Sequence, residues 1–255
     1  MAILGTKEWA EHNRNCFKGC RYNCKYCYAR KDAKRWGRII KDDDWPTMVF
    51  NDRCMMQTGK VDGRIMFPTT HDIQPEHADK WFPFLQAMLA NGNHVLIVSK
   101  PNLASIRMIC DKLINYRNQI EFRFTIGTDD ELTRMYWEPE APSVGERIRC
   151  LQLAHEAGFR TSVSMEPLLT DNPAVLIERI SPYVTGTIWI GMMNHMSIKD
   201  FQNGREVVWF HEMKRINSYV TMKKIHDQFK NDKRICWKDS IRDLLDLGSL
   251  FAGPR

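Results

Sequence analysis

The sequence predicts an α/β fold, a partial (β/α)6 TIM-like barrel with a C-terminal helical extension. Short apolar runs alternate with amphipathic helical segments, and successive runs begin about 26 to 39 residues apart. Such alternation predicts a parallel sheet with right-handed crossovers. A length of 255 residues suits one barrel-like domain. We therefore expect a single domain over residues 1–255, with a core at about 13–195 and the extension at about 206–255.

The first half of the expected barrel begins with a weak strand just before Cys16. A short buried strand is expected over residues 65–67. Apolar residues then recur at helical spacing over residues 78–90, and Gly92 ends that helix. Residues 94–99, the run HVLIVS, form the clearest strand of the chain.

The middle of the chain repeats this order. Residues 103–116 carry apolar side chains at helical spacing, and residues 120–126 alternate as a strand does. Ser143 and Glu146 have the spacing of a capping box, so the next helix begins there and ends near residue 157.

The last predicted barrel elements are a strand over residues 159–165, a helix over 172–180 and a strand over 187–192. Two or three helices around a short strand at 234–237 make up the extension. A doubly wound sheet is the alternative architecture, because hydrophobic periodicity does not separate it from an open barrel.

Polar side chains follow the predicted strands at their carboxyl ends, where a barrel of this kind places its active site. In chain order they are Thr69, Thr70, His71 and Asp72; Ser99 and Lys100; Thr128 and Asp129; Ser164 and Glu166; and Asn194 and His195.

Three closely spaced cysteines, Cys20, Cys24 and Cys27, carry the clearest chemical signal of the chain. Their spacing is C-x₃-C-x₂-C, with Tyr26 and Tyr28 flanking the last one. Three thiolates on one tight loop can bind three irons of a [4Fe–4S] cluster, which is usually held by four thiolates. The fourth iron then stays open to an outside ligand.

A zinc site is the competing interpretation of these cysteines. Cys16 could add a fourth ligand. The net charge of +6, with basic and aromatic residues at 28–31 (YARK) and 34–36 (KRW), would suit a zinc-stabilised nucleic-acid-binding module without catalysis. Structural zinc sites, however, usually place four ligands in two separated pairs, and no second C-x₂-C pair follows.

The composition of the chain indicates its expected cellular location and the kinds of partner it can have. No run of about 18 apolar residues is present, and the first fifteen residues lack the apolar core of a signal peptide. We therefore expect no membrane partner and a cytoplasmic location, where thiols stay reduced. The sequence pI near 8.9 permits a phosphate-bearing partner.

Several motifs resemble the radical S-adenosylmethionine (SAM) superfamily, in particular the spore photoproduct lyase-like branch and related phage-encoded radical SAM proteins. The resemblance covers about residues 13–195. Its motifs are the cysteine loop through Arg30, THDIQPE at 70–76, IVSK at 97–100, FTIGT at 124–128, the EP, PS and ER pairs between 138 and 147, and EPLL at 166–169.

The resemblance implies an enzyme that uses a [4Fe–4S] cluster to cleave SAM reductively to a 5′-deoxyadenosyl radical. That radical would abstract hydrogen from a substrate that remains to be identified, for which a nucleic acid or nucleotide is the expected class. An electron donor such as flavodoxin or ferredoxin would be a partner.

The resemblance also assigns roles to residues. Cys20, Cys24 and Cys27 would bind the cluster. Tyr26, Thr70, Lys100, Thr125 and Thr128 would contact SAM. The candidate catalytic residues are chosen by their place at the ends of the predicted strands and are Lys100, Glu166, Asp72 and His71. Cys16 is expected to be dispensable.

The chain departs from the family pattern at two points. The Gly-Gly-Glu motif of many radical SAM enzymes is absent from the second strand. Residues 65–70 also hold no cysteine, whereas the lyase carries a hydrogen-donating cysteine late in that strand. The repair of thymine dimers is therefore not the expected reaction.

Overall fold

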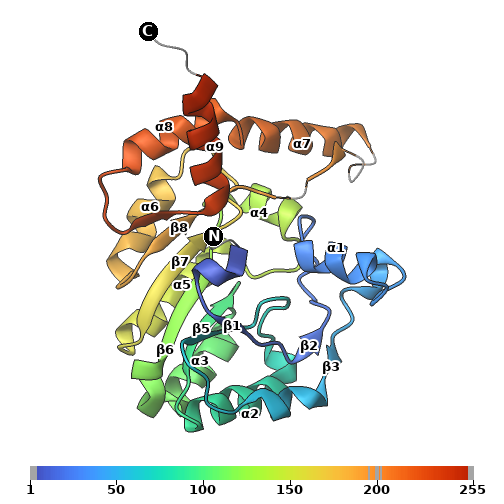
Figure 1. Ribbon diagram of the computed structural model, residues 1–255, viewed down its shortest axis with the longest axis vertical. Coiled ribbons are helices and arrows are strands. Elements are labelled where there is room, and N and C mark those ends of the chain that lie inside the picture. The colour runs from blue at the N-terminus through green and yellow to red at the C-terminus, as the bar shows by residue number, and fades with distance from the viewer. Residues whose placement is uncertain (1–4, 195, 199–200, 202, 252–255) are drawn as a thin grey trace.

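A parallel sheet forms the centre of the protein, as Figure 1 shows. The structure is a computed structural model that describes residues 5–194, 196–198, 201 and 203–251. His195, expected at a strand end, lies outside these described residues. In spatial order the strands are β1 (His12–Asn13), β4 (Arg64–Phe67), β5 (His94–Ser99), β6 (Ile120–Thr125), β7 (Arg160–Met165), β8 (Ile188–Ile190) and β9 (Ile235–Trp237).

Helices connect these strands. They are α1 (Tyr28–Arg35), α2 (Ala78–Ala90), α3 (Leu103–Lys112), α4 (Glu131–Trp137), α5 (Val144–Glu156), α6 (Ala174–Ile180), α7 (Gly204–Ile216), α8 (Tyr219–Phe229) and α9 (Asp239–Phe251). Each neighbouring strand pair is parallel, and the spatial order follows the chain order. The predicted fold class, a partial TIM-like β/α barrel with a helical extension, is confirmed.

The extension also contributes to the barrel sheet. Its short strand β9 pairs with β8, so Ile188, Trp189 and Ile190 lie beside Ile235, Cys236 and Trp237. The described sheet therefore has seven strands, one more than the six expected from the core of the sequence. This last strand brings residues of the extension to the carboxyl end of the barrel.

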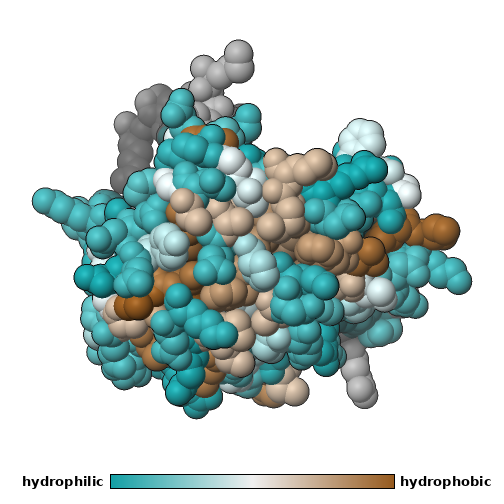
Figure 2. Space-filling view, turned by 90° about the horizontal axis from the view of Figure 1, so that it is seen from below, coloured by the Kyte–Doolittle hydropathy of each residue, from teal (hydrophilic) through white to brown (hydrophobic). Residues whose placement is uncertain are grey.

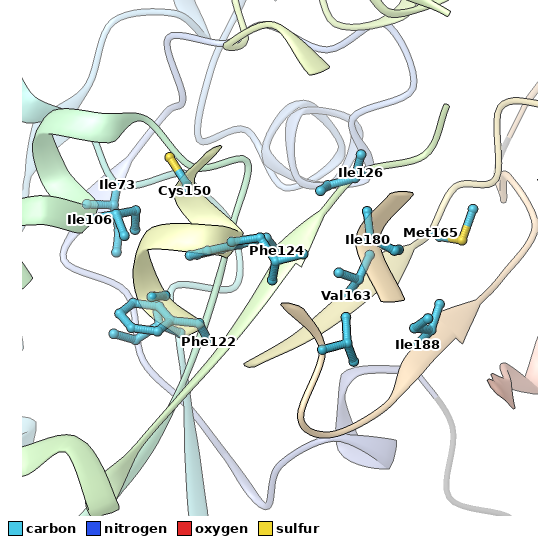
Figure 3. Packing of buried hydrophobic residues seen from close by; sticks show 14 of the residues in the cluster. Ile73, Ile106, Phe122, Phe124, Ile126, Cys150, Val163, Met165, Ile180 and Ile188 are labelled. Atoms are coloured by element: carbon cyan, nitrogen blue, oxygen red, sulfur yellow. The ribbon is translucent and has the colours of Figure 1, made fainter. Parts of the chain in front are cut away.

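The two faces of the sheet have different chemistry because successive side chains point to opposite faces. One face packs against the helices and is apolar. Figure 3 shows this packing, in which Phe122, Phe124, Val163, Met165 and Ile188 meet residues of the surrounding helices. Burial of this continuous apolar layer is the main stabilising contribution to the fold.

The other face, inside the barrel, carries buried charge. Arg123 donates to Glu121 at 3.0 Å, and Ser162 donates to the same carboxylate at 2.9 Å. The Arg123 guanidinium carbon also lies 4.9 Å from the ring centre of Trp9 and 5.5 Å from that of Trp189. A buried charge needs such partners, which explains why strand β6 alternates polar and aromatic residues.

An N-terminal strap, residues Gly5–Trp9, lies between the two ends of the sheet (Figure 1). Arg64 of β4 donates to the carbonyl oxygen of Trp9 at 2.9 Å through Nε. On the other side, the Gly5 N–H donates to Asp239 Oδ2 at 3.0 Å, just after β9. The strap thus connects the first strands of the barrel with its last one.

The surface agrees with the mean hydropathy of −0.45. On the face seen in Figure 2, hydrophilic residues predominate, and a band of apolar ones runs between them. Within the described residues, no helix is long and apolar enough to span a bilayer.

Candidate active site

The three cysteines lie on a loop whose shape depends on Gly19. Gly19 has a φ of +87°, in the left-handed region that glycine adopts without strain. A Cβ at this position would lie 2.6 Å from the carbonyl oxygen of Trp45 and would collide with that of Thr47. This close approach lets the Cys20 N–H donate to the Trp45 carbonyl at 2.9 Å.

Short-range hydrogen bonds close the rest of the loop. The Asn23 N–H donates to the Cys20 carbonyl at 3.3 Å, and the Cys27 N–H donates to the Cys24 carbonyl at 3.1 Å. Arg30 then holds the loop from α1, because its guanidinium donates to Asn23 Oδ1 at 2.7 Å and to the Lys25 carbonyl at 3.0 Å. The motif therefore forms a closed turn whose last cysteine, Cys27, is the N-cap of α1.

The three thiols line one cavity of about 700 Å³, which we call the strand-end cavity. It lies at the carboxyl ends of the barrel strands, as the sequence predicts. Cys20 and Cys24 are almost fully buried, and Cys27 is partly exposed. The volume falls in the range of small-molecule and cofactor sites.

The donor set of the loop fits an iron–sulfur cluster. Burial raises the pKa of the Cys24 thiol to about 12, and the nearby Lys100 charge opposes that rise. Burial also raises the pKa of Cys27, which backbone N–H groups at the start of α1 oppose. Bound metal deprotonates such thiols, and the positive end of a helix favours the resulting negative charge.

The same loop does not suit a lone metal ion. Among the described residues, no three His, Cys, Asp or Glu side chains converge on a single-ion position. A cubane cluster spreads three thiolates over three irons, so it does not require that convergence. The zinc interpretation therefore lacks support from the geometry.

Asp72 links the cysteine loop to Lys100. Its Oδ1 accepts hydrogen bonds from Ser99 Oγ at 2.8 Å and from the Lys100 N–H at 2.6 Å. Its Oδ2 lies 3.7 Å from Cys20 Sγ and 3.8 Å from Lys100 Nζ. The Lys100 ammonium lines the strand-end cavity and lies 5.6 Å from the ring centre of Tyr26. Asp72 thus holds a largely buried cation beside the thiols.

Tyr26 belongs to a second buried network. Its hydroxyl donates to Glu138 Oε1, and Glu138 Oε2 lies 2.5 Å from Arg147 Nη2. Arg147 also donates to the carbonyl oxygens of Pro142 at 2.9 Å and Thr125 at 3.2 Å. Glu138 and Arg147 are each 1% exposed. This pair ties the ring before the last cysteine to the end of β6.

Thr70 and Thr125 also line the strand-end cavity, but Thr128 does not. The Thr70 N–H donates to Asn15 Oδ1 at 2.9 Å. Thr128 is buried, and its Oγ1 accepts a hydrogen bond from the Asp130 N–H at 3.0 Å in the turn before α4. The structure therefore brings together the predicted cofactor residues with the exception of Thr128.

His71 is occupied by the backbone. Its Nε2 accepts the N–H groups of Cys16 at 3.2 Å and Phe17 at 3.3 Å, so Nδ1 carries the proton and donates to the Asp72 carbonyl at 3.2 Å. Burial lowers the pKa of His71 to about 4. The imidazole is neutral at physiological pH, and it holds the chain that enters the cysteine loop.

Glu166 lies in the strand-end cavity together with a residue that the sequence analysis did not single out. Lys238, which follows β9, is 1% exposed and lines the same cavity. Its Nζ lies 3.9 Å from Glu166 Oε2. The local sequence around Lys238 does not predict that this residue lines the cavity, because its position depends on the pairing of β9 with β8.

Cys16 lies apart from the cysteine loop. It is fully buried in the main apolar core with Cys54, whereas Cys20 and Cys24 belong to a separate cluster that includes Trp45. Its Sγ lies 3.8 Å from His71 Nε2. The structure thus gives it packing contacts and no place on the cavity wall.

Replacing Cys16 with alanine should leave cluster binding intact. The change removes a buried sulfur and should lower stability by roughly 1–3 kcal/mol through the small cavity it leaves. Iron and sulfide content after anaerobic reconstitution measures the first effect, and chemical denaturation measures the second. A Cys16→Ala protein that folds but loses iron would make Cys16 a ligand.

Known proteins resemble this chain in sequence. The family described as the Radical SAM superfamily matches residues 15–175. An uncharacterized protein of Methanocaldococcus jannaschii is 24% identical over 227 residues, which cover 87% of this chain and 85% of that protein. An uncharacterized protein of Acidianus two-tailed virus is 25% identical over 169 residues, covering 60% of this chain and 54% of the viral protein.

Solved structures of spore photoproduct lyase share the fold. A variant with bound AdoMet and dinucleoside spore photoproduct has a TM-score of 0.53 and 16% identity, covering 81% of this chain. Another variant, with dinucleoside spore photoproduct, has a TM-score of 0.57 and 15% identity, covering 84%. This chain spans 61% and 62% of the length of those two chains.

Proposed function

The chain belongs to the radical SAM superfamily, and from this premise we propose that it cleaves SAM reductively and acts on a nucleic acid or nucleotide. The observation that carries the proposal is the convergence of three loop cysteines and a largely buried lysine on one cavity at the strand ends. Members of the superfamily use a [4Fe–4S] cluster and SAM. Cys20, Cys24 and Cys27 are the residues that we propose as cluster ligands.

The cluster and SAM, when bound, supply a 5′-deoxyadenosyl radical, and the chain supplies binding and orientation. Lys100 is suited to the SAM carboxylate, because its ammonium is a compact charge with three donors, and Asp72 contacts both its backbone N–H and its ammonium. Thr70 and Thr125 offer hydroxyl groups on the same wall. Tyr26, held by Glu138, provides a fixed ring beside the last cysteine.

His71 and Asp72 fit positioning roles better than contact with substrate. The imidazole of His71 has both nitrogens engaged by backbone groups. Both oxygens of Asp72 face groups of the protein, namely Ser99, Lys100 and Cys20. We therefore assign them to the support of the cysteine loop and of Lys100.

An electron must reach the site for each SAM that is cleaved reductively. We propose a one-electron donor such as flavodoxin or ferredoxin as the partner in the cell. A chemical reductant replaces it in the experiments below.

Two observations favour a nucleic-acid substrate. The spore photoproduct lyase structures hold a dinucleoside photoproduct. Helix α1 and the residues after it also present basic side chains beside the cysteine loop, with Arg35 over the exposed ring of Trp36 at 5.5 Å. Lys34 is paired with Asp42 at 2.9 Å, so Arg35 and Arg38 are the better candidates for phosphate contacts.

The reaction class is tested by anaerobic reconstitution with iron and sulfide, followed by incubation with SAM, dithionite and single-stranded DNA or RNA. We expect a brown protein and the formation of 5′-deoxyadenosine. A colourless protein that binds zinc and nucleic acid without cleaving SAM would support the competing binding module instead.

Replacing Lys100 with methionine should weaken SAM binding by about 10- to 100-fold. A charge-assisted hydrogen bond contributes roughly 1.5–3 kcal/mol, and each 1.4 kcal/mol corresponds to a factor of ten. Isothermal titration of the reconstituted protein measures the affinity. Lys112→Met, an exposed lysine on α3, is the matched control. A large drop in melting temperature with unchanged SAM affinity would make Lys100 structural.

Binding of single-stranded DNA should weaken with salt, and Arg35→Ala with Arg38→Ala should reduce the slope. Each lost phosphate contact lowers the slope of log K against log salt by about 0.7. Fluorescence anisotropy at three salt concentrations measures this. Lys224→Ala with Lys233→Ala removes the same charge at exposed sites in and just after α8 and should leave the slope unchanged. An affinity for DNA that does not change with salt concentration would exclude a phosphate-based contact.

A further inference from the structure

Three residues form a row across the last strands of the barrel. Met165 of β7, Ile190 of β8 and Trp237 of β9 are register partners. The next residue on each strand is Glu166, Gly191 and Lys238. Because side chains alternate along strands, these three positions face the barrel interior, opposite to their predecessors.

Gly191 leaves the space in which the other two side chains meet. A Cβ on Gly191 would lie 2.9 Å from Cγ of Glu166 and 2.9 Å from Cγ of Lys238. Any larger residue would push one of them aside, since contacts this short do not occur for real Cβ atoms. The missing side chain allows Glu166 and Lys238 to approach each other across β8.

Lys238 is held firmly by the N-terminal strap. Its Nζ donates to the Gly5 carbonyl at 2.7 Å and pairs with Glu8, and it lies 4.7 Å from the ring centre of Trp9. Arg242 also pairs with Glu8. The strap therefore holds the ammonium through contacts with Gly5, Glu8 and Trp9.

The carboxyl of Glu166, in contrast, has hydrogen-bonding positions that no described residue fills. Its side chain makes no hydrogen bond to the residues that the structure describes, and its only ion pair is the 3.9 Å contact with Lys238. The side chain is 23% exposed, into the strand-end cavity. The carboxyl therefore offers acceptor positions toward the cavity that a ligand can use.

The charged groups around Glu166 shift the pKa of its carboxyl in both directions. Burial raises its pKa to about 7, Lys238 and Arg123 oppose this rise, and Asp239 and Glu8 reinforce it. The Tyr28 hydroxyl is also within electrostatic reach of the carboxyl. The group therefore gains and loses its proton near neutral pH.

We propose that the Glu166–Gly191–Lys238 row recognises the hydrogen-bonding edge of a substrate base, with Glu166 as the contacting residue and Lys238 as a positioning residue. This inference rests on the proposed nucleic-acid substrate. Gly191 and Lys238 lie beyond residues 15–175, the part that matches the family, so membership does not assign them. Met192 and Met193 on the same cavity wall offer polarisable apolar surface to a flat ring.

The protonation state of Glu166 determines which edge it can bind. A neutral carboxyl presents one donor beside one acceptor, which matches a base edge with an N–H next to an acceptor, as in cytosine or thymine. A carboxylate presents acceptors alone. Two-point binding of such an edge therefore requires the protonated form.

The test compares a ten-nucleotide oligocytidylate with an abasic oligonucleotide of the same length, bound to reconstituted protein at about pH 6 and pH 8. With a pKa near 7, the protonated fraction falls about tenfold between these values, so the preference for the base-containing strand should fall up to tenfold. Glu166→Gln keeps one donor and one acceptor, so it should retain the preference at both pH values. Glu178→Gln, an exposed carboxylate on α6, should behave like wild type.

Two further variants test the row itself. Lys238→Met removes a charge that lowers the pKa of Glu166, so the loss of base preference should move to higher pH. Gly191→Ala should push the side chain of Glu166 or of Lys238 aside, and so reduce base preference without changing the binding of the abasic strand. Melting curves show whether each variant is folded.

The outcomes distinguish base recognition by this row from the binding of nucleic acid as such. Equal binding of both oligonucleotides at both pH values would contradict base recognition by the row, and it would still agree with a nucleic-acid substrate. Absence of binding to either oligonucleotide, in protein that cleaves SAM, would overturn the row together with the nucleic-acid substrate. A protein without cluster or SAM cleavage would overturn the proposed reaction itself.

Discussion

Replacing Cys24 with alanine should abolish cluster binding and SAM cleavage together. Cys24 is 5% exposed and lines the strand-end cavity. In the sequence it lies between the other two loop cysteines. Changes to groups that only support metal ligands cost about 10- to 100-fold, so loss of a ligand should cost more than about 100-fold in SAM cleavage. The visible absorbance of the reconstituted protein and the yield of 5′-deoxyadenosine measure both effects.

Cys110→Ala is the matched control for that experiment. Cys110 is also a nearly buried cysteine, but it lies on α3 in the apolar core and not on the cysteine loop. It should keep full iron content, with a loss of stability only. A Cys24→Ala protein that retains an active cluster would contradict the assignment of the three ligands.

Replacing Arg147 with methionine should destabilise the protein by about 3–5 kcal/mol. The change leaves Glu138 as a buried carboxylate without its ion-pair partner, and breaking a buried pair in this way is strongly destabilising. For a chain of this size the melting temperature should fall by roughly 6–20 °C. Chemical denaturation of the protein before reconstitution measures the free energy of unfolding directly.

The same substitution should also weaken SAM binding, because Glu138 holds the Tyr26 hydroxyl. Arg149→Met is the control, since Arg149 is exposed on the same helix α5. Exposed substitutions usually change stability by less than about 0.5 kcal/mol. An Arg147→Met protein as stable as the Arg149→Met protein would show that the buried pair contributes little.

The sequence predicted the regular elements well where periodicity was strong. The strand over residues 94–99 and the helix over 78–90 agree with β5 and α2 at both ends. The predicted helix over 103–116 ends at Lys112, and a 3-10 segment, Ile114–Gln119, continues the chain. The role of β9 could not be predicted, because three residues carry no usable period and their pairing partner lies far away in the chain.

The parts of the candidate site that are local in sequence could be predicted to lie together. The three cysteines and most of the polar residues selected at strand ends line one cavity at the carboxyl ends of the strands. The Tyr26–Glu138–Arg147 network joins residues more than a hundred positions apart, so no local pattern revealed it. Thr128 was selected by its place after a strand, but the turn before α4 uses its hydroxyl.

The contact between the N-terminal strap and the segment after β9 has a consequence for biosynthesis. The Gly5 N–H and the carboxylate of Asp239 are 234 residues apart in sequence. A ribosome adds about 5–20 residues per second, so the cysteine loop is complete roughly 10–40 s before Lys238 is made. During that time the nascent chain contains the three cysteines of the loop, but it lacks the last segment that lines the strand-end cavity. Until Lys238 is made, the cavity that Cys20, Cys24 and Cys27 line therefore lacks the part of its wall that the segment after β9 contributes.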